Sequence, residues 1–177
     1  NQFYAVVATS TFGIHFMTID QAGTVVQNLS FDFPGLPYIQ KRPAIRESAT
    51  PGHYYVCASY RADSAVVGLI DATTLFPTFT WANFYNANWI EPTDLIESPY
   101  NANELIVVGR CDIPTFAPNA DGFFMSLNTI NGAPNSFITY TKYIVDHCDE
   151  WFSSIEIANS TAGGSNGYAL GGRSNYG

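Results

Sequence analysis

The segment of this sequence that comes nearest to a catalytic motif is Gly163–Gly167, which reads Gly-Gly-Ser-Asn-Gly and matches G-x-S-x-G. In enzymes that use this motif, the serine stands on a sharp turn after a strand and before a helix. Here a strand-like segment begins at Tyr168, where the helix would have to be. We therefore interpret Gly163–Gly167 as a hairpin loop and not as a nucleophile elbow.

A second segment, Asp146–Glu150 (Asp-His-Cys-Asp-Glu), gathers side chains that can ligate a metal. Zinc sites combine such ligands with a second pair elsewhere in the chain, but His15 and His53 stand apart from it beside aromatic residues. A calcium site needs a regular loop of Asp and Asn residues, and this segment has none. We expect an acidic loop here, with no metal ion and no other cofactor.

Three glutamates, Glu47, Glu97 and Glu156, align in three similar segments. Paired carboxylates can hydrolyse glycosides, but this needs one acid and one base in different environments. Residues that recur with a structural unit usually contact turns or backbone within that unit. We predict that these glutamates are structural and that the chain carries no catalytic residue.

Two further segments, Asn83–Trp89 and Asp112–Asp121, could form ligand-binding loops, because loops carry much of the binding function of rigid folds. Phe84, Tyr85 and Trp89 in the first segment are the candidates for stacking on a sugar. Exposed aromatic residues of this kind also serve ordinary packing, and both interpretations stay open.

Four kinds of strand-like segment recur in one order, about every 50 residues. The first kind has a small residue at its fifth position, which is Ala8, Ala58, Gly109 or Gly172. The second kind ends on Asp or Asn before a turn, and the third is rich in β-branched and aromatic residues. The fourth kind precedes the next cycle. Segments of the first kind lie at 4–10, 54–60, 105–111 and 168–174, and those of the second at 14–20, 65–71 and 122–128. Segments of the third kind lie at 25–33, 79–85 and 136–144, and those of the fourth at 44–48, 94–98 and 153–157.

This pattern predicts an all-β chain made of β-propeller blades, since four short strands per cycle is the composition of a blade. No stretch has the apolar spacing of a helix. The Asp and Asn residues should turn the chain by bonding the backbone two residues on, and the small residues suit the crowded strand nearest a propeller axis. A β-sandwich and an elongated β-solenoid are the alternatives.

Composition limits the function further. Apolar residues make up 46% of the 177 residues, charged residues 12%, and the net charge is −8. Nucleic-acid binding needs a basic stripe, and a membrane-spanning helix needs roughly 20 consecutive apolar residues; neither is present, so we expect no nucleic-acid partner and no membrane insertion. Cys57, Cys111 and Cys148 can form at most one disulfide within the chain, and free buried thiols are equally consistent.

Two stretches carry a family resemblance: Ser154-Ile155 followed by Gly167–Gly172, and Asp121–Asn128 with Gly132 closing the turn. They resemble the propeller repeats of secreted bacterial proteins of the gliding Bacteroidota. Where that family often has Lys in its aliphatic strand, this chain has other residues, and the first cycle matches poorly between Phe33 and Lys41. The resemblance implies a propeller and an extracellular or cell-surface location, but it transfers no catalytic residue.

Three sequence signals suggest glycosylation. Asn28 and Asn159 begin N-x-S/T sequons, which matter in a secreted eukaryotic protein. Ser64 lies in Asp-Ser-Ala, which is similar to a short O-glycosylation motif of Bacteroidota.

We interpret residues 1–177 as a single domain that is part of a larger propeller, with repeats at about 1–50, 51–101 and 102–164 and the start of a fourth at 165–177. Closed propellers need four or more blades, so we expect a longer protein or contact with other chains. The predicted role is non-catalytic extracellular binding, adhesion or surface structure, with a protein, a glycan or further copies of itself as partner. The alternatives are a carbohydrate-active propeller whose acids lie partly outside this segment, and a subunit of a surface filament.

Overall fold

The computed structural model describes residues 3–9, 13–32, 43–61, 64–86, 89–112, 120–140, 149–158 and 167–175. These residues form thirteen β-strands, with no helix among them, so the all-β prediction is confirmed. Within these ranges the structure contains no helix that is long and apolar enough to span a membrane.

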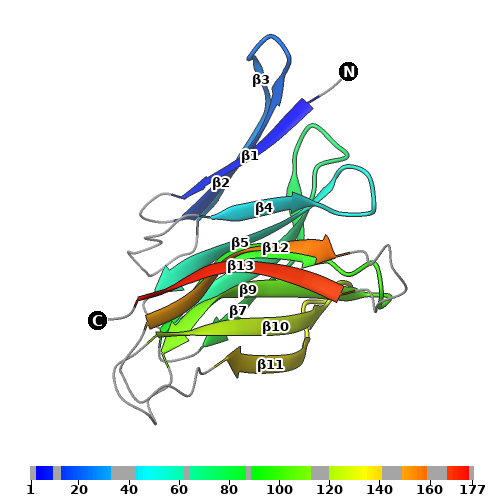
Figure 1. Cartoon of the computed structure of the whole chain (residues 1–177). Helices are drawn as coiled ribbons and strands as arrows, with labels where there is room; N and C mark the ends of the chain where they lie inside the picture. Colours follow the sequence, from blue (N-terminus) through cyan, green and yellow to red (C-terminus); the bar gives the residue numbers. More distant parts are fainter. Residues whose placement is uncertain are drawn as a thin grey trace.

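The strands form four antiparallel sheets, and within each sheet every strand lies beside its neighbour in the chain (Figure 1). The first sheet contains β1 (Phe3–Thr9), β2 (Gly13–Asp20) and β3 (Val25–Asp32). The second contains β4 (Ala44–Glu47), β5 (His53–Arg61), β6 (Ser64–Asp71) and β7 (Thr78–Asn86). The third contains β8 (Trp89–Glu97), β9 (Glu104–Asp112), β10 (Ala120–Asn128) and β11 (Pro134–Tyr140), and the fourth β12 (Asp149–Ala158) and β13 (Gly167–Asn175).

The turns after β2, β6 and β10 are built as the sequence predicts. A side-chain oxygen of the last strand residue accepts a hydrogen bond from the backbone N–H two residues on, which closes the turn. These bonds run from Ala22 to Asp20 at 2.9 Å, from Thr73 to Asp71 at 2.9 Å and from Ile130 to Asn128 at 2.8 Å. The prediction about the turn residues is therefore confirmed.

Sheet boundaries differ from the cycle boundaries that the sequence suggested. Each of the last three sheets begins with the segment placed last in its cycle, because β4, β8 and β12 pair with the strands that follow them. The sheets consequently divide the chain near residues 43, 88 and 148, and not near 50, 101 and 164. A repeating pattern defines the period of a unit but not the point at which the unit starts.

Neighbouring sheets pack face to face through apolar side chains, which removes those side chains from water. The second and third sheets share the largest cluster, which includes the fully buried Val67, Leu95 and Phe123. The first sheet packs on the second around Ile14 and Phe16. The fourth packs on the third around a cluster of Ile106, Val108 and Ile155.

Glycines in the second strand of the third and fourth sheets face the backbone of the first strand. A Cβ atom on Gly109 of β9 would lie 2.0 Å from the carbonyl oxygen of Glu91, and one on Gly172 of β13 would lie 2.3 Å from that of Trp151. Both glycines lie next to a β-bulge in the partner strand. These two glycines lie in the second strand of their sheets, and the close approach of the backbone of the first strand requires glycine there.

The close approach at Gly109 yields a stability prediction. Gly109→Ala should lower the free energy of unfolding by about 3 kcal/mol, because the new methyl group must displace the backbone of β8. Gly167→Ala is the matched control, since no atom lies within 4 Å of a Cβ there; it should change stability by less than about 0.5 kcal/mol. Urea denaturation of both variants measures the difference, and equal effects would contradict the close contact.

Candidate functional site

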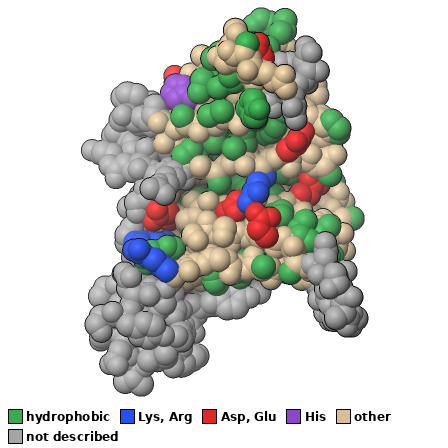
Figure 2. All heavy atoms as spheres, turned by 45° about the horizontal axis from the view of Figure 1, so that its top comes forward, with side chains coloured by type: hydrophobic (Ala, Val, Ile, Leu, Met, Phe, Trp, Pro, Cys, Tyr) green, Lys and Arg blue, Asp and Glu red, His purple; other side chains and the backbone are tan. Residues whose placement is uncertain are grey.

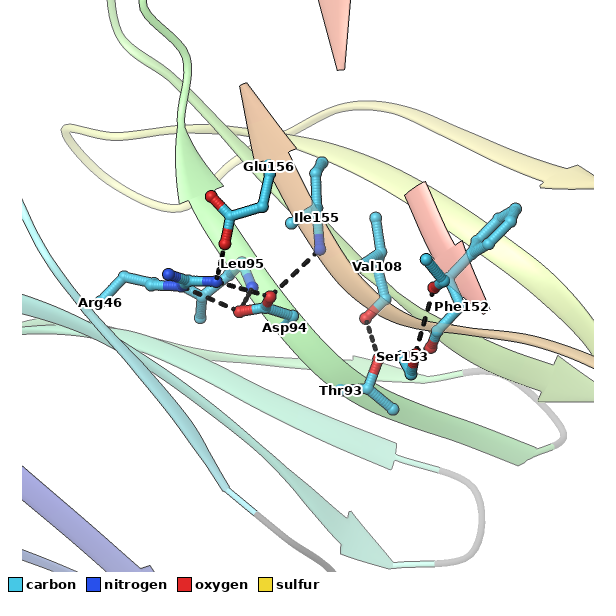
Figure 3. A network of polar contacts seen from close by, with 10 residues as sticks. Arg46, Thr93, Asp94, Leu95, Val108, Phe152, Ser153, Ile155 and Glu156 are labelled. Carbon is cyan, nitrogen blue, oxygen red and sulfur yellow. Dashed lines mark hydrogen bonds and ion pairs between the residues drawn. The ribbon is translucent and has the colours of Figure 1, made fainter. Parts of the chain in front are cut away.

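The most connected polar site lies where the first strands of three sheets meet (Figure 3). Arg46 of β4 donates two hydrogen bonds to the carboxylate of Asp94 on β8, from Nε at 3.1 Å and from Nη2 at 2.8 Å. The Asp94 side chain is only 10% exposed, whereas that of Arg46 is 36% exposed. The hydrogen bonds to Asp94 are the main cause that raises the pKa of the Arg46 guanidinium, so Arg46 stays charged at every physiological pH.

The same carboxylate also binds the fourth sheet. Asp94 accepts a hydrogen bond from the backbone N–H of Ile155 on β12 at 3.1 Å, and one from the N–H of Leu95 at 2.9 Å. Beside it, the Thr93 hydroxyl donates to the carbonyl oxygen of Phe152 at 2.6 Å. Two consecutive side chains of β8 therefore fasten the backbone of β12 to the third sheet.

Glu156 on β12 completes the network but does not occupy the position that the sequence suggested. It accepts a hydrogen bond from Arg46 Nη2 at 3.1 Å, with its own side chain 64% exposed. Glu47 and Glu97 pair with the first residues of equivalent segments, Tyr54 and Leu105. In the fourth sheet the first residue of the corresponding segment is Tyr168, and it pairs with Ile157 instead of Glu156. Glu156 therefore lies one position away from the place that Glu47 and Glu97 occupy in their strands.

Glu97 has the structural role that was predicted for the three glutamates. Its carboxylate accepts hydrogen bonds from the Ser48 hydroxyl at 2.9 Å and from the Ala49 N–H at 2.8 Å, which hold the turn after β4. Glu47 is exposed. The three glutamates do not form a common site.

The chemistry available to the Arg46 network is that of a structural ion pair. Acid–base catalysis by two carboxylates requires environments that separate their proton affinities. Asp94 and Glu156 instead bind the same guanidinium. The geometry therefore holds three strands together and does not assemble a general acid and a general base.

The other chemistry-bearing segments lie largely outside the described residues. Only Gly167 of the Gly163–Gly167 motif is described, and it begins β13, so a strand and not a helix follows the motif. Residues 146–148 of the acidic segment and residues 113–119 of the loop that begins at Asp112 also lie outside. Among the side chains that are described, no three His, Cys, Asp or Glu residues cluster in a way that could hold a metal.

The predicted ligand-binding aromatics are strand residues and not loop residues. Phe84 and Tyr85 belong to β7 and Trp89 begins β8. Tyr85 is partly buried and donates a hydrogen bond to the carbonyl oxygen of Gly132 in the next sheet. Phe84 is 45% exposed and its ring lies 4.6 Å from that of Tyr60. A ligand-binding role for these residues stays a prediction.

The glycosylation candidates differ in accessibility. Asn28 is exposed on β3, as an acceptor must be. Ser64 is 6% exposed and its hydroxyl donates to Asn86 at 2.8 Å, so it is inaccessible to a transferase in the folded chain. Asn159 lies outside the described residues.

Sequence reasoning missed one site, a cleft of about 450 Å³ near the beginnings of β8 and β12, within the size range of small-molecule sites. Its lining includes Glu91, Arg110 and Trp151. Arg110 Nε lies 3.4 Å from a Glu91 oxygen, and the guanidinium of Arg173 lies 4.1 Å from the centre of the Trp151 ring. The arginines each follow the small residue of a first-kind segment, at 109 and 172, and this shared position was a usable signal.

Neither a protein-family model nor a curated protein sequence matches the chain.

The network around Asp94 predicts unequal costs for its two ion pairs. Arg46→Met should lower the free energy of unfolding by about 2 kcal/mol, because it leaves the nearly buried Asp94 carboxylate without its guanidinium. Glu156→Gln should cost less than about 1 kcal/mol, since this pair is exposed and screened. Urea denaturation at pH 7 compares the two variants. A larger loss in Glu156→Gln would refute this assignment.

The described cysteines should be chemically inert. Cys57 and Cys111 are buried, and burial raises the pKa of the Cys57 thiol well above its ordinary value, so the reactive thiolate is scarce. In a Cys148→Ser variant, which removes the cysteine outside the described residues, a thiol-specific chromogenic reagent should label neither thiol before unfolding and both in denaturant. Rapid labelling of the native variant would contradict the burial.

Proposed function

We propose that this chain forms consecutive β-propeller blades and acts outside the cell as a non-catalytic binding or surface-structural module. The order of strands supports the blade interpretation. Three sheets begin with a strand at one edge, β4, β8 or β12, and β8 lies against both of the others. In a propeller, blades are arranged around an axis, and one edge strand of each blade lies near that axis. The convergence of β4, β8 and β12 is consistent with such an arrangement.

Repeated bonds between sheets also support this interpretation. Side chains of the last strand in one sheet donate hydrogen bonds to a turn of the following sheet. Strand β3 binds the turn between β6 and β7, and β7 binds the turn between β10 and β11. Gln27 of β3 donates to the carbonyl oxygen of Ala72 at 3.0 Å. Trp81 and Asn83 of β7 donate to those of Thr129 and Asn131, each at 2.8 Å. The same attachment at two successive boundaries favours one unit that is used repeatedly.

The observation that carries the proposal is the correspondence between the bulges of β8 and β12. Thr93 and Ser153 are the bulge residues, and each hydroxyl donates to the carbonyl oxygen of a matching residue in the following strand, Val108 and Gly171. Thr93 also binds the next sheet through Phe152. The exposed Ser153 thus offers the bond by which a further blade would attach.

A rigid frame of this kind suits binding better than catalysis. At the converging edge the Arg46 guanidinium is paired with the carboxylates of Asp94 and Glu156, and Figure 2 shows a basic side chain among acidic ones near the middle of that face. Surface clefts near the strand ends remain for a ligand. The extracellular location rests on the resemblance to secreted bacterial propeller repeats.

An array of immobilised neutral and acidic glycans, probed with the labelled chain, tests the proposal. We expect saturable binding to a subset of glycans, which are then released unchanged, as mass spectrometry of the eluted sugars would record. Cleavage of the bound glycans would favour the carbohydrate-active alternative instead. The filament alternative predicts concentration-dependent self-association in sedimentation velocity with no glycan bound. A heat-unfolded sample is the control for non-specific adsorption.

A further inference from the structure

The cleft near the beginnings of β8 and β12 draws residues from the ends of three sheets. Pro43 precedes β4, Glu91 and Thr93 belong to β8, and Trp151 and Ser153 belong to β12. Bulges at Thr93 and Ser153 bend both strands at this point. The hydrogen bonds of Asp94 to Ile155 and of Thr93 to Phe152 hold together the strands that line the cleft.

Positive charge is concentrated at this cleft. The structure describes the side chains of Arg46, Arg110 and Arg173, and Arg46 is bound to Asp94 and Glu156. Arg110 lines the cleft, and Arg173 lies on the Trp151 ring at its rim. The net charge of the chain is −8. Two of the three arginine side chains that the structure describes nevertheless lie at this one opening.

Trp151 organises these two arginines. Its ring centre lies 4.1 Å from the guanidinium carbon of Arg173 and 5.7 Å from that of Arg110, and both distances are within the range of cation–π attraction. A guanidinium that stacks on a ring keeps its N–H groups in the plane of the fork, where they can donate to a carboxylate. Arg173 is exposed, so its donors are accessible to a ligand.

We propose that this cleft binds an acidic sugar, a uronic acid unit of a glycan. Arg110 and Arg173 engage the sugar carboxylate, because a guanidinium fork matches the two carboxylate oxygens. Trp151 holds both guanidinium groups beside the opening through cation–π contacts. The carboxylate of Glu91 accepts hydrogen bonds from the sugar hydroxyls. This inference rests on the proposed binding function and specifies its ligand class.

The net charge of the chain makes the proposal specific. A chain of net charge −8 repels anions at long range, so general attraction to acidic polymers does not explain binding. Affinity for an acidic sugar must come from short-range contacts in the cleft. The Glu91 carboxylate beside Arg110 disfavours a group that carries two negative charges, and so favours a sugar unit with one carboxylate.

Titration calorimetry with trigalacturonate and with the neutral maltotriose tests this site. We expect trigalacturonate to bind saturably and maltotriose to bind at least tenfold more weakly. Arg173→Ala should weaken trigalacturonate binding about tenfold or more, since hydrogen bonds to a charged group are lost. Arg173→Lys, which keeps the charge but removes the fork, should bind with intermediate affinity.

Thr50→Asp is the matched control, because it makes the net charge more negative by one unit, as Arg173→Ala does, at an exposed turn beyond the opposite end of β4. It should leave binding unchanged, and circular dichroism should be the same for all variants. Unchanged affinity in Arg173→Ala, equal binding of the two sugars, or no binding would overturn the acidic-sugar site. A tripeptide with a free C-terminal carboxylate serves as a competing ligand. If it bound more tightly than trigalacturonate, and if Arg173→Ala removed that binding, the ligand class would be overturned. Glycans retained on the array by Arg173→Ala would leave the general binding proposal intact.

Discussion

The arrangement of the sheets depends on one carboxylate, that of Asp94, which binds three strands from three sheets. A strand at the edge of a sheet carries backbone N–H groups without a ladder partner. Asp94 accepts such a bond from Ile155 and therefore ties β12 to β8. A nearly buried carboxylate is costly without a counter-charge, and Arg46 of the preceding sheet provides it. One residue thereby couples the second, third and fourth sheets.

The bulge beside Asp94 has two further consequences. The cleft lined by Trp151 lies beside this bulge and the matching bulge of β12. The bulge also brings the backbone of β8 so close to β9 that only glycine fits at position 109. The packing of β8 on β9 and the lining of the cleft thus involve the same local irregularity.

Strand positions and turns could be predicted from the sequence because both are local properties. Alternating apolar residues identify a strand, and the oxygen of Asp20 or Asn128 bonds a neighbouring N–H without help from the rest of the fold. The alignment of Glu156 with Glu47 and Glu97 was wrong because pairing with β13, and not the local sequence, sets its position. A shift of one residue along a strand moves a side chain to the opposite face.

The sequence alone determined that this chain is all-β, that it uses short strands in a repeated order, and which Asp and Asn residues form its turns. These features follow from side-chain type and spacing over a few residues. Only the tertiary structure decided where each sheet starts, that Asp94 and Arg46 join separate sheets, and that Arg110, Arg173 and Trp151 meet at one cleft. Those contacts join residues far apart in the chain, and their geometry depends on strand register and bulges that no short segment encodes.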